Sequence, residues 1–417
     1  MKDSKAAPLT LPANGPIVAA GPVYALDCFL ARQILAFMNN APLTVVLWNG
    51  EEIGANHTRI AGRIHIRDRG ALWKLCLNPD LHFGDLYSVG RVDVEGDFVR
   101  CLETAYTGAA NMPSQGAINW LRRAMNRPRR NTLSSSREHI QHHYDLGNEF
   151  YQLWLDNEAM QYTCAYYPDP AMTLEQAQRA KMDHVCRKLM LRPGDRVVEA
   201  GCGWGGLARH MVRHYGVTVH SYNISREQIR YAREQAEQQG LDRHIEYVED
   251  DYRNIRGEFD VFVSIGMLEH VGRENYLQLG EVANRCLTAT GRGLIHSIGR
   301  NKPELMNAWI EKRIFPGAYP PSLREMMQIF EPHQLCVVDV ENIRLHYART
   351  LTHWLERFER HAHQIEKTYD TAFVRAWRLY LAGSIAAFTT GTLQLFQVLF
   401  TRERYNDLPP SRKHLYH

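Results

Sequence analysis

The sequence of 417 residues has few of the features that mark secreted, metal-dependent or nucleic-acid-binding proteins. Its eight cysteines are scattered and form no C-x-x-C pair, which argues against a zinc site and a disulfide framework. The formal net charge is only +3, too small to predict nucleic-acid binding by itself. Residues 1–12 have no apolar core typical of a signal peptide. We therefore expect a cytoplasmic protein with no metal site and no nucleic-acid partner.

Charge is also absent from Leu379–Thr401, a stretch long enough to span a bilayer. The stretch nevertheless contains glycine, serine, threonine and glutamine, which are unfavourable in a membrane-spanning helix. We therefore predict a buried helix pair within a mostly helical C-terminal region. A more specific hypothesis is that this segment forms the wall of a long apolar cavity.

The first part of the chain is predicted to form a tail, residues 1–19, and a small α+β domain, residues 20–110. Cys28–Met38 has helical spacing, and strands are predicted at Leu43–Trp48, Gly62–Ile66 and Asp93–Glu95. No catalytic constellation is recognisable there, so we expect a module for lipid binding or docking.

Residues 111–137 are predicted to be a basic linker. The stretch 104–137 contains six arginines and no acidic residue. Such a segment is either a solvated connector or a polybasic patch on an anionic membrane surface, where each basic residue contributes about 1 kcal/mol.

The remainder, residues 138–417, is predicted to be an α/β catalytic domain. Thr173 and Gln176 form a capping box before a helical pattern, and a turn at residues 193–195 leads into a first strand. Further strands are predicted at Val217–Tyr222, Ile245–Val248, Phe259–Ile265 and Leu294–Ile298. Strands alternating with helices form an open, mostly parallel sheet that binds ligands at the carboxyl ends of its strands. Beyond Pro303 the pattern is largely helical.

A glycine-rich loop follows the first predicted strand, in the sequence Val-Val-Glu-Ala-Gly-Cys-Gly-Trp-Gly-Gly of residues 197–206. Glycines permit a tight turn and a close approach of backbone to ligand, so the loop predicts a nucleotide-like cofactor. It satisfies the dinucleotide pattern G-x-G-x-x-G, but the end of the second strand offers no carboxylate for an NAD ribose. Instead Glu199 lies two residues before the first glycine. This arrangement resembles that of S-adenosylmethionine (SAM) methyltransferases, in which the acid can meet the cofactor's amino group.

Two further motifs narrow the function. The aromatic-rich run from His142 to Tyr151, continuing through Met160–Tyr167, is either core or a lid over the site. In the second motif, Ser264–Gly272, Glu269 follows the fourth strand and serves either as a helix cap or in chemistry. Over residues 137–402 the chain resembles the cyclopropane-fatty-acyl-phospholipid synthases and the mycolic acid cyclopropane synthases. The resemblance also includes Ile314–Gly317, Glu331–His333, His346-Tyr347 and Trp354–Phe358.

This resemblance implies a Rossmann-like SAM methyltransferase sheet with helical acyl-binding additions. It implies transfer of a methylene from SAM to the cis double bond of an unsaturated phospholipid acyl chain, which forms a cyclopropane ring. The implied cofactor-binding residues are Tyr162, Thr163, Glu199, Gly201, Gly203, Gly205, Asn223, Gln228 and Asp250. Gln228 takes the ribose, and Asp250, if it is not simply a capping residue, takes the adenine amino group.

The resemblance further implies a bound bicarbonate ion as the base that removes a proton from the added methyl. Its implied ligands are the side chains of Glu269, His296 and Tyr347 and backbone groups of Cys164 and Ile298. The aromatic faces of Tyr347, Tyr166 or Trp354 are expected to stabilise a cation on the acyl chain, each by about 0.5–2 kcal/mol.

One position departs from the family, because Ser384 stands where a cysteine is common. The serine weakens any thiolate role, agrees with a bicarbonate base, and leaves the product open between a cyclopropane and a branch. The alternatives are therefore a fatty-acyl C-methyltransferase giving a methyl or methylene branch, and a catalytically silent lipid-binding protein. The intact set of Glu269, His296 and Tyr347 argues against the silent protein. The expected partners are an unsaturated phospholipid, the anionic inner face of a membrane and a second copy of the chain.

Overall fold

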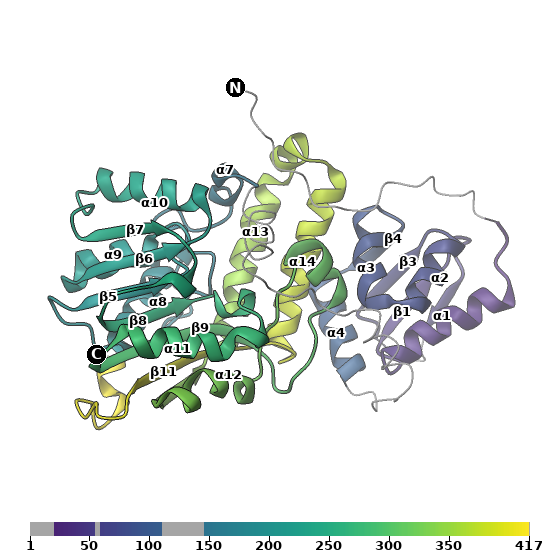
Figure 1. Ribbon diagram of the computed structural model, residues 1–417. Coiled ribbons are helices and arrows are strands. Elements are labelled where there is room, and N and C mark those ends of the chain that lie inside the picture. The colour runs from purple at the N-terminus through teal and green to yellow at the C-terminus, as the bar shows by residue number, and fades with distance from the viewer. Residues whose placement is uncertain (1–20, 55–58, 111–145, 417) are drawn as a thin grey trace.

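The computed structural model describes residues 21–54, 59–110 and 146–416. Figure 1 shows an N-terminal domain on one side, a large sheet on the other, and the long helices α13 and α14 between them. The predicted tail (1–19) and basic linker (111–137), together with residues 142–145 of the aromatic-rich motif, lie outside the described residues.

The N-terminal domain combines a small sheet with four helices. Its strand order is β2-β1-β3-β4, with β1 parallel to β3 and the other pairs antiparallel. The sheet buries a core that includes Val45, Ile64 and Leu72. Its elements are α1 (Ala25–Phe37), β1 (Leu43–Val46), β2 (Glu52–Gly54), β3 (Gly62–Ile66), α2 (Arg69–Leu77), α3 (Pro79–Ser88), β4 (Val92–Gly96) and α4 (Phe98–Ala110).

The larger sheet has seven strands in the order β10-β11-β9-β8-β5-β6-β7. The central strands are parallel, and β11 runs antiparallel to both β9 and β10. The fold class predicted from the alternating pattern is therefore confirmed. The strands are β5 (Arg196–Ala200), β6 (Thr218–Asn223), β7 (Ile245–Glu249), β8 (Phe259–Ile265), β9 (Leu287–Gly299), β10 (Leu335–Asn342) and β11 (Gln394–Arg402).

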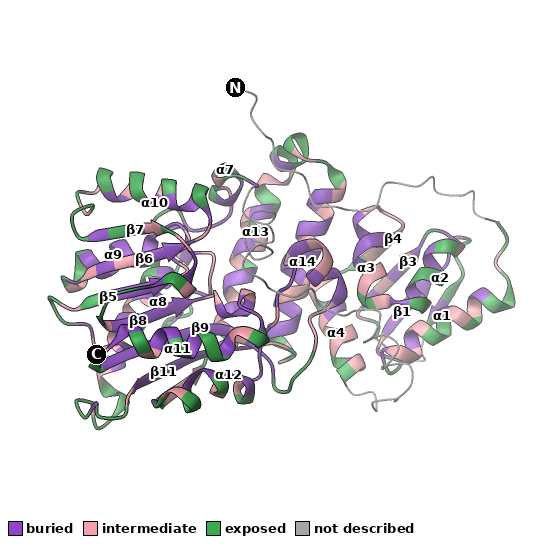
Figure 2. Cartoon of the chain, viewed as in Figure 1, coloured by how far each residue is buried: buried purple, intermediate pink, exposed green. Residues whose placement is uncertain are grey.

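Helices cover both faces of this sheet, so its central strands are buried on both sides (Figure 2). One face packs against α8 (Leu174–Lys188), α9 (Gly206–Tyr215) and α10 (Arg226–Gln238). The other packs against α11 (Tyr276–Cys286) and α12 (Leu323–Phe330). The predicted capping box begins α8, where the Thr173 hydroxyl accepts the backbone N–H of Gln176. Short helical turns are η1 (Tyr252–Asn254), η2 (Leu268–His270), η3 (Arg273–Asn275), η4 (Ile310–Ile314), η5 (Glu331–His333) and η6 (Arg412–Leu415).

An aromatic core lies between the sheet and the N-terminal domain. The helices α7 (Asn148–Gln152), α13 (Arg344–Thr368) and α14 (Thr371–Thr389) contribute most of it. Trp154, Trp354 and Trp377 are fully buried there. The opposite side of α14 packs against α3 and α4, so this helix connects the two domains.

The C-terminal region differs from its prediction. It contains the strands β10 and β11, and Leu379–Thr401 comprises the end of α14, a turn and β11 rather than a helix pair. The turn includes Gly391, whose φ of +77° is the left-handed conformation that glycine tolerates. The prediction failed because a short apolar run in a buried strand cannot be distinguished from a buried helix by periodicity. In the part of the chain that the structure describes, no helix is long and apolar enough to cross a membrane.

Candidate active site

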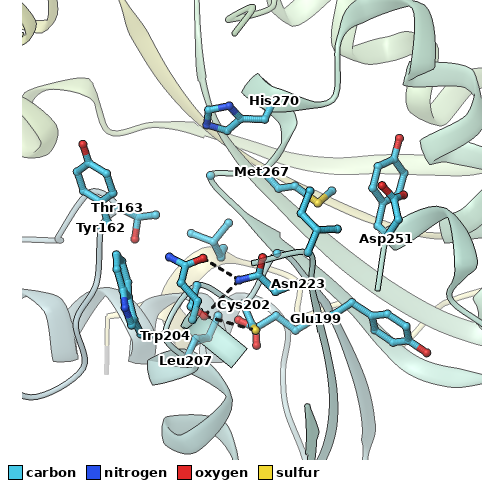
Figure 3. Close-up of a pocket in the computed structure, with 18 of the residues that line it drawn as sticks. Tyr162, Thr163, Glu199, Cys202, Trp204, Leu207, Asn223, Asp251, Met267 and His270 are labelled. Carbon is cyan, nitrogen blue, oxygen red and sulfur yellow. Dashed lines mark hydrogen bonds between the residues drawn. The ribbon is translucent and has the colours of Figure 1, made fainter. Parts of the chain in front are cut away.

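A pocket opens at the carboxyl ends of β5, β6 and β8, where the sheet topology predicts a ligand. Figure 3 shows Tyr162 and Trp204 on one side of it, Asp251 on the other, and Glu199 and Asn223 between them. The predicted cofactor residues Tyr162, Thr163, Glu199, Gly201, Gly203, Asn223, Gln228 and Asp250 all line this pocket.

The glycine loop has a backbone that other residues would not adopt without strain. Gly201, Gly203 and Gly205 have φ values of +86°, +52° and +74°. A Cβ on Gly201 would lie 3.0 Å from Cβ of Met267, and one on Gly205 would lie 2.4 Å from Oη of Tyr247. Gly205 does not line the pocket but caps the N-terminus of α9. The loop therefore presents bare backbone to a ligand at a helix N-terminus.

Glu199 places a buried carboxyl on the pocket wall near the end of β5. It is only 2% exposed, and the Ser221 hydroxyl donates to Oε2 at 2.7 Å. Burial raises its pKa to about 7, although Ser221 and the cations of Lys181 and Arg209 lower it. A bound ammonium would favour the ionised form, so this residue fits the amino group of SAM.

Asn223 and Gln228 form a polar part of the pocket wall next to the glycine loop. The Asn223 amide donates to Oε1 of Gln228 at 2.9 Å and to the carbonyl of Gly203 at 3.3 Å. Asp250 also lines the pocket, while its Oδ1 accepts the backbone N–H of Asp251 and the amide of Asn254. Asp250 thus lies on the wall of the pocket, and the residue that caps η1 is its neighbour Asp251.

Lys181 of α8 is a site residue that the sequence patterns did not indicate. It is fully buried, and its ammonium donates to the Thr163 hydroxyl at 3.0 Å and to Oε1 of Gln161. Burial lowers its pKa to about 8, whereas the carboxylates of Asp156 and Glu199 raise it. Lys181 therefore holds the segment that carries Tyr162 and Thr163 against the pocket. The described residues contain no cluster of histidine, cysteine, aspartate and glutamate able to hold a metal ion.

A second group of side chains lies beside this pocket and centres on Glu269. Glu269 follows β8 in the turn η2, and its Oε1 accepts the backbone N–H of Ile298 at 2.6 Å. Its Oε2 is buried and has no hydrogen-bond partner among the described residues. Burial raises the Glu269 pKa to about 7, against the lowering effect of the Ile298 hydrogen bond. Ile298, predicted as a direct ligand, here uses its backbone N–H to hold Glu269.

His296 and Tyr347, the other two predicted side-chain ligands, come from distant segments: His296 lies two residues before Ile298 on β9, and Tyr347 lies on α13. His296 of β9 is 1% exposed, and burial together with nearby Lys181 and Lys188 lowers its pKa to about 3. Its Nδ1 lies 3.1 Å from Nε2 of Gln397 on β11. Tyr347 of α13 packs its ring 4.7 Å from Phe388 and 5.9 Å from Trp354. The ring of Trp354 in turn lies 5.4 Å from that of Tyr162 at the cofactor pocket.

Cys164 adjoins the cofactor pocket because it follows Thr163 directly. The next residue, Ala165, donates its N–H to the Thr350 hydroxyl at 3.0 Å, which fixes this segment against the start of α13. Burial raises the pKa of the Cys164 thiol well above its usual value, so the thiol stays neutral. A backbone role, as predicted, is thus more consistent with this site than a thiolate role.

The aromatic residues expected near the reacting atoms divide into two sets. Tyr347, Trp354 and Tyr162 form a connected wall, and the hydroxyls of Tyr162 and Tyr380 lie 2.9 Å apart. Tyr166 does not belong to this wall, because its ring stacks on the imidazoles of His184 and His346 at 4.2 and 4.7 Å. Ser384 is half-buried on α14, one helical turn after Tyr380.

Comparison with known proteins identifies the class and the family. The family model described as mycolic acid cyclopropane synthetase matches residues 131–398, and a domain of unknown function (DUF7884) matches residues 30–115. A Pseudomonas putida protein named probable fatty acid methyltransferase is 34% identical over 398 residues, 90% of this chain and 96% of its own. The cyclopropane-fatty-acyl-phospholipid synthase of Escherichia coli K12 is 43% identical over 271 residues, 65% of this chain and 69% of its own.

Among solved structures, the mycolic acid cyclopropane synthase CmaA1 complexed with SAH and CTAB has a TM-score of 0.61 at 28% identity. It covers 64% of this chain and 98% of its own. The fold and the pocket therefore define a SAM-dependent methyltransferase. This chain belongs to the mycolic acid cyclopropane synthetase family, as its motifs predicted. Membership supports transfer of a methyl or methylene group from SAM to the acyl chain of a lipid.

Proposed function

We propose that this protein converts a cis double bond in a phospholipid acyl chain into a cyclopropane ring, with bicarbonate as the base. The observation that carries the proposal is Glu269, a buried carboxyl with one unpartnered oxygen beside the SAM pocket. A buried polar oxygen without a partner in a native structure indicates a missing ligand or a catalytic role. The 43% identity to a cyclopropane-fatty-acyl-phospholipid synthase supports the phospholipid substrate.

SAM, when bound, supplies an electrophilic methyl group to the double bond. Addition of that methyl leaves a positive charge on the acyl chain, next to the wall formed by Tyr347, Trp354 and Tyr162. Aromatic faces stabilise a desolvated cation by about 0.5–2 kcal/mol each. Because Trp354 and the core around it are buried, these residues also exclude water, which would otherwise capture the cation as an alcohol.

Ring closure requires removal of a proton from the added carbon. Glu269, His296 and Tyr347, together with the backbone at Cys164, would hold a bicarbonate ion, which supplies the base. Neutral His296 and Tyr347 are hydrogen-bond donors to an anion, and the raised pKa of Glu269 favours a protonated carboxyl that donates as well. A neutral pocket of donors is suited to hold an oxygen anion without an additional buried negative charge.

A second candidate is a fatty-acyl C-methyltransferase that gives a methyl or methylene branch. The full-length similarity to a probable fatty acid methyltransferase of Pseudomonas putida favours this candidate. Ser384 leaves the same choice open, because the family commonly has cysteine at this position. In this candidate a hydride first migrates from the newly methylated carbon to the neighbouring cationic carbon. Loss of a proton from the new methyl then gives a methylene branch, and loss of a proton from a chain carbon gives a methyl-branched alkene.

The substrate and the basic stretch at 104–137 lead us to propose a peripheral membrane protein at the anionic cytoplasmic surface. Six arginines without an acidic residue would bind anionic headgroups. Flotation with vesicles of phosphatidylglycerol should recover the protein at low salt, whereas phosphatidylcholine vesicles should not. The homodimer is likewise a proposal, and analytical ultracentrifugation of the purified chain tests it.

Mass spectrometry of the lipid product tests the proposed reaction. Purified protein, SAM and vesicles of a cis-unsaturated phospholipid should give lipid that has gained one CH₂ and lost its double bond. Removal of bicarbonate with carbonic anhydrase under a nitrogen stream should lower turnover, and added bicarbonate should restore it. A product that retains a double bond would establish the branched alternative, and turnover independent of bicarbonate would exclude bicarbonate as the base.

A further inference from the structure

Gln397 is a fully buried glutamine on β11 that contacts the predicted site residue His296. It lies directly opposite His296 in the antiparallel pair of β11 and β9. Both side chains point to the face of the sheet covered by α8, because Leu294 and Leu399, two residues from each, belong to that core. Gln397 is 0% exposed and His296 1%, so water does not compete for the hydrogen bond between them.

The contact joins Nε2 of Gln397 to Nδ1 of His296 at 3.1 Å. An amide nitrogen can only donate, so Nδ1 accepts and carries no proton. Burial and the cations of Lys181 and Lys188 keep the ring neutral. A neutral imidazole has one N–H, which must then lie on Nε2.

The opposite orientation of the amide is less favourable. In the observed orientation, the amide oxygen Oε1 of Gln397 is the side-chain atom that is buried without a hydrogen-bond partner, and it is an acceptor. Reversal would pair Oε1 with a protonated Nδ1 and leave the two N–H donors of the amide buried without acceptors. Unsatisfied buried donors are rarer in native proteins than under-satisfied carbonyls.

We propose that Gln397 is a positioning residue that holds His296 as the Nε2–H tautomer, so that the ring donates to the oxygen anion held beside Glu269. The inference rests on the proposed function for the identity of that anion, but the tautomer itself does not depend on it. Without Gln397 the two neutral tautomers would exchange, and the Nδ1–H form would present a lone pair where a donor is needed.

The tautomer is measured by ¹⁵N NMR of the full chain labelled at histidine nitrogens, with the His296 signals assigned by their absence in His296→Gln. We expect Nε2 protonated in the wild type, both tautomers in Gln397→Leu, and a protonated Nδ1 in Gln397→Glu, whose carboxylate accepts from that nitrogen. Gln394→Leu is the matched control, because Gln394 is a buried glutamine of the same strand that bonds Asn342 instead. Its His296 signals should equal those of the wild type.

Turnover provides the second measurement. We expect Gln397→Leu to lower kcat at least tenfold and to raise the KM for bicarbonate, with the dissociation constant of S-adenosylhomocysteine unchanged. A wild-type His296 protonated on Nδ1, or a Gln397→Leu protein with wild-type tautomer and turnover, would overturn the proposal. If the tautomer results are as expected but turnover does not depend on bicarbonate, the proposed base is wrong. The role of Gln397 in setting the His296 tautomer is then still supported. If Gln397→Leu does not fold, the wild type and the isosteric Gln397→Glu decide the question.

Discussion

The cofactor pocket and the neighbouring group around Glu269 are built in different ways. The pocket consists of the ends of adjacent parallel strands and a loop of exposed backbone, all between residues 160 and 271. The residues predicted to hold the base, Glu269, His296 and Tyr347, instead come from a turn after β8, strand β9 and helix α13, and Tyr347 belongs to the aromatic core. Cofactor binding thus depends on local geometry, whereas the proposed proton transfer depends on a bicarbonate ion held by groups from distant segments. Substitutions should separate the two functions.

The largest expected effect is on turnover, without a change in cofactor binding. Glu269→Ala should lower kcat by about 10²- to 10⁴-fold, the range for loss of general base catalysis, because Glu269 is proposed to hold the bicarbonate base. The dissociation constant of S-adenosylhomocysteine, measured by calorimetry, should stay unchanged. Glu281→Ala, an exposed carboxylate on α11, is the control and should keep wild-type turnover. Wild-type turnover in Glu269→Ala would remove this residue from the mechanism.

The next largest effect is expected on the affinity for the cofactor, through a substitution in the glycine loop. Gly201→Ala should weaken S-adenosylhomocysteine about 10- to 100-fold, because a left-handed backbone costs a residue with a Cβ about 1–2 kcal/mol and the new atom would crowd Met267. Gly194→Ala is a matched control, since Gly194 has a similar φ of +89° with no atom within 4 Å of its added Cβ. Equal losses of affinity in both variants would show that backbone strain, not the pocket, determines the result.

Lys181 tests whether the two regions are independent, since it contacts Thr163 and lies near His296. Lys181→Met should weaken S-adenosylhomocysteine about fivefold, equivalent to about 1 kcal/mol for the lost hydrogen bonds. In the wild type the affinity should fall as pH rises through about 8, where the ammonium loses its proton. In the variant this pH dependence should disappear. An unchanged pH profile of binding would assign the dependence to another group.

The smallest effect concerns stability without ligand. The Glu269 pKa is about 7 in the folded protein and near its ordinary value of 4.5 in the unfolded chain. The unfolded chain therefore loses this proton first, and stability falls as pH rises from 4.5 to 7. Glu269→Gln should reduce that fall by roughly 1 kcal/mol, or about 1 °C in Tm for a chain of this length. Calorimetric melting of the wild type and of Glu269→Gln between pH 4.5 and 7 measures this difference. The same dependence of Tm on pH in both proteins would contradict a Glu269 pKa raised by burial.

The sequence alone determined those features that depend on neighbours in the chain. The glycine loop, the capping box at Thr173 and the order of strands and helices up to β9 follow from local spacing, and so does the choice of SAM over NAD. The separated motifs that resemble the cyclopropane synthases also located Glu269, His296 and Tyr347. Their identities were predictable because each sits in a recognisable local pattern.

Tertiary structure alone decided what depends on distant pairing and burial. β11 was predicted as a helix because its apolar residues have no periodicity of their own, and only pairing with β9 and β10 makes it a strand. That pairing sets Gln397 against His296 across 101 residues of sequence. Burial keeps His296 neutral and raises the pKa of Glu269, and it places Lys181 beneath the pocket. A residue's protonation state follows from its surroundings, which the order of amino acids does not display.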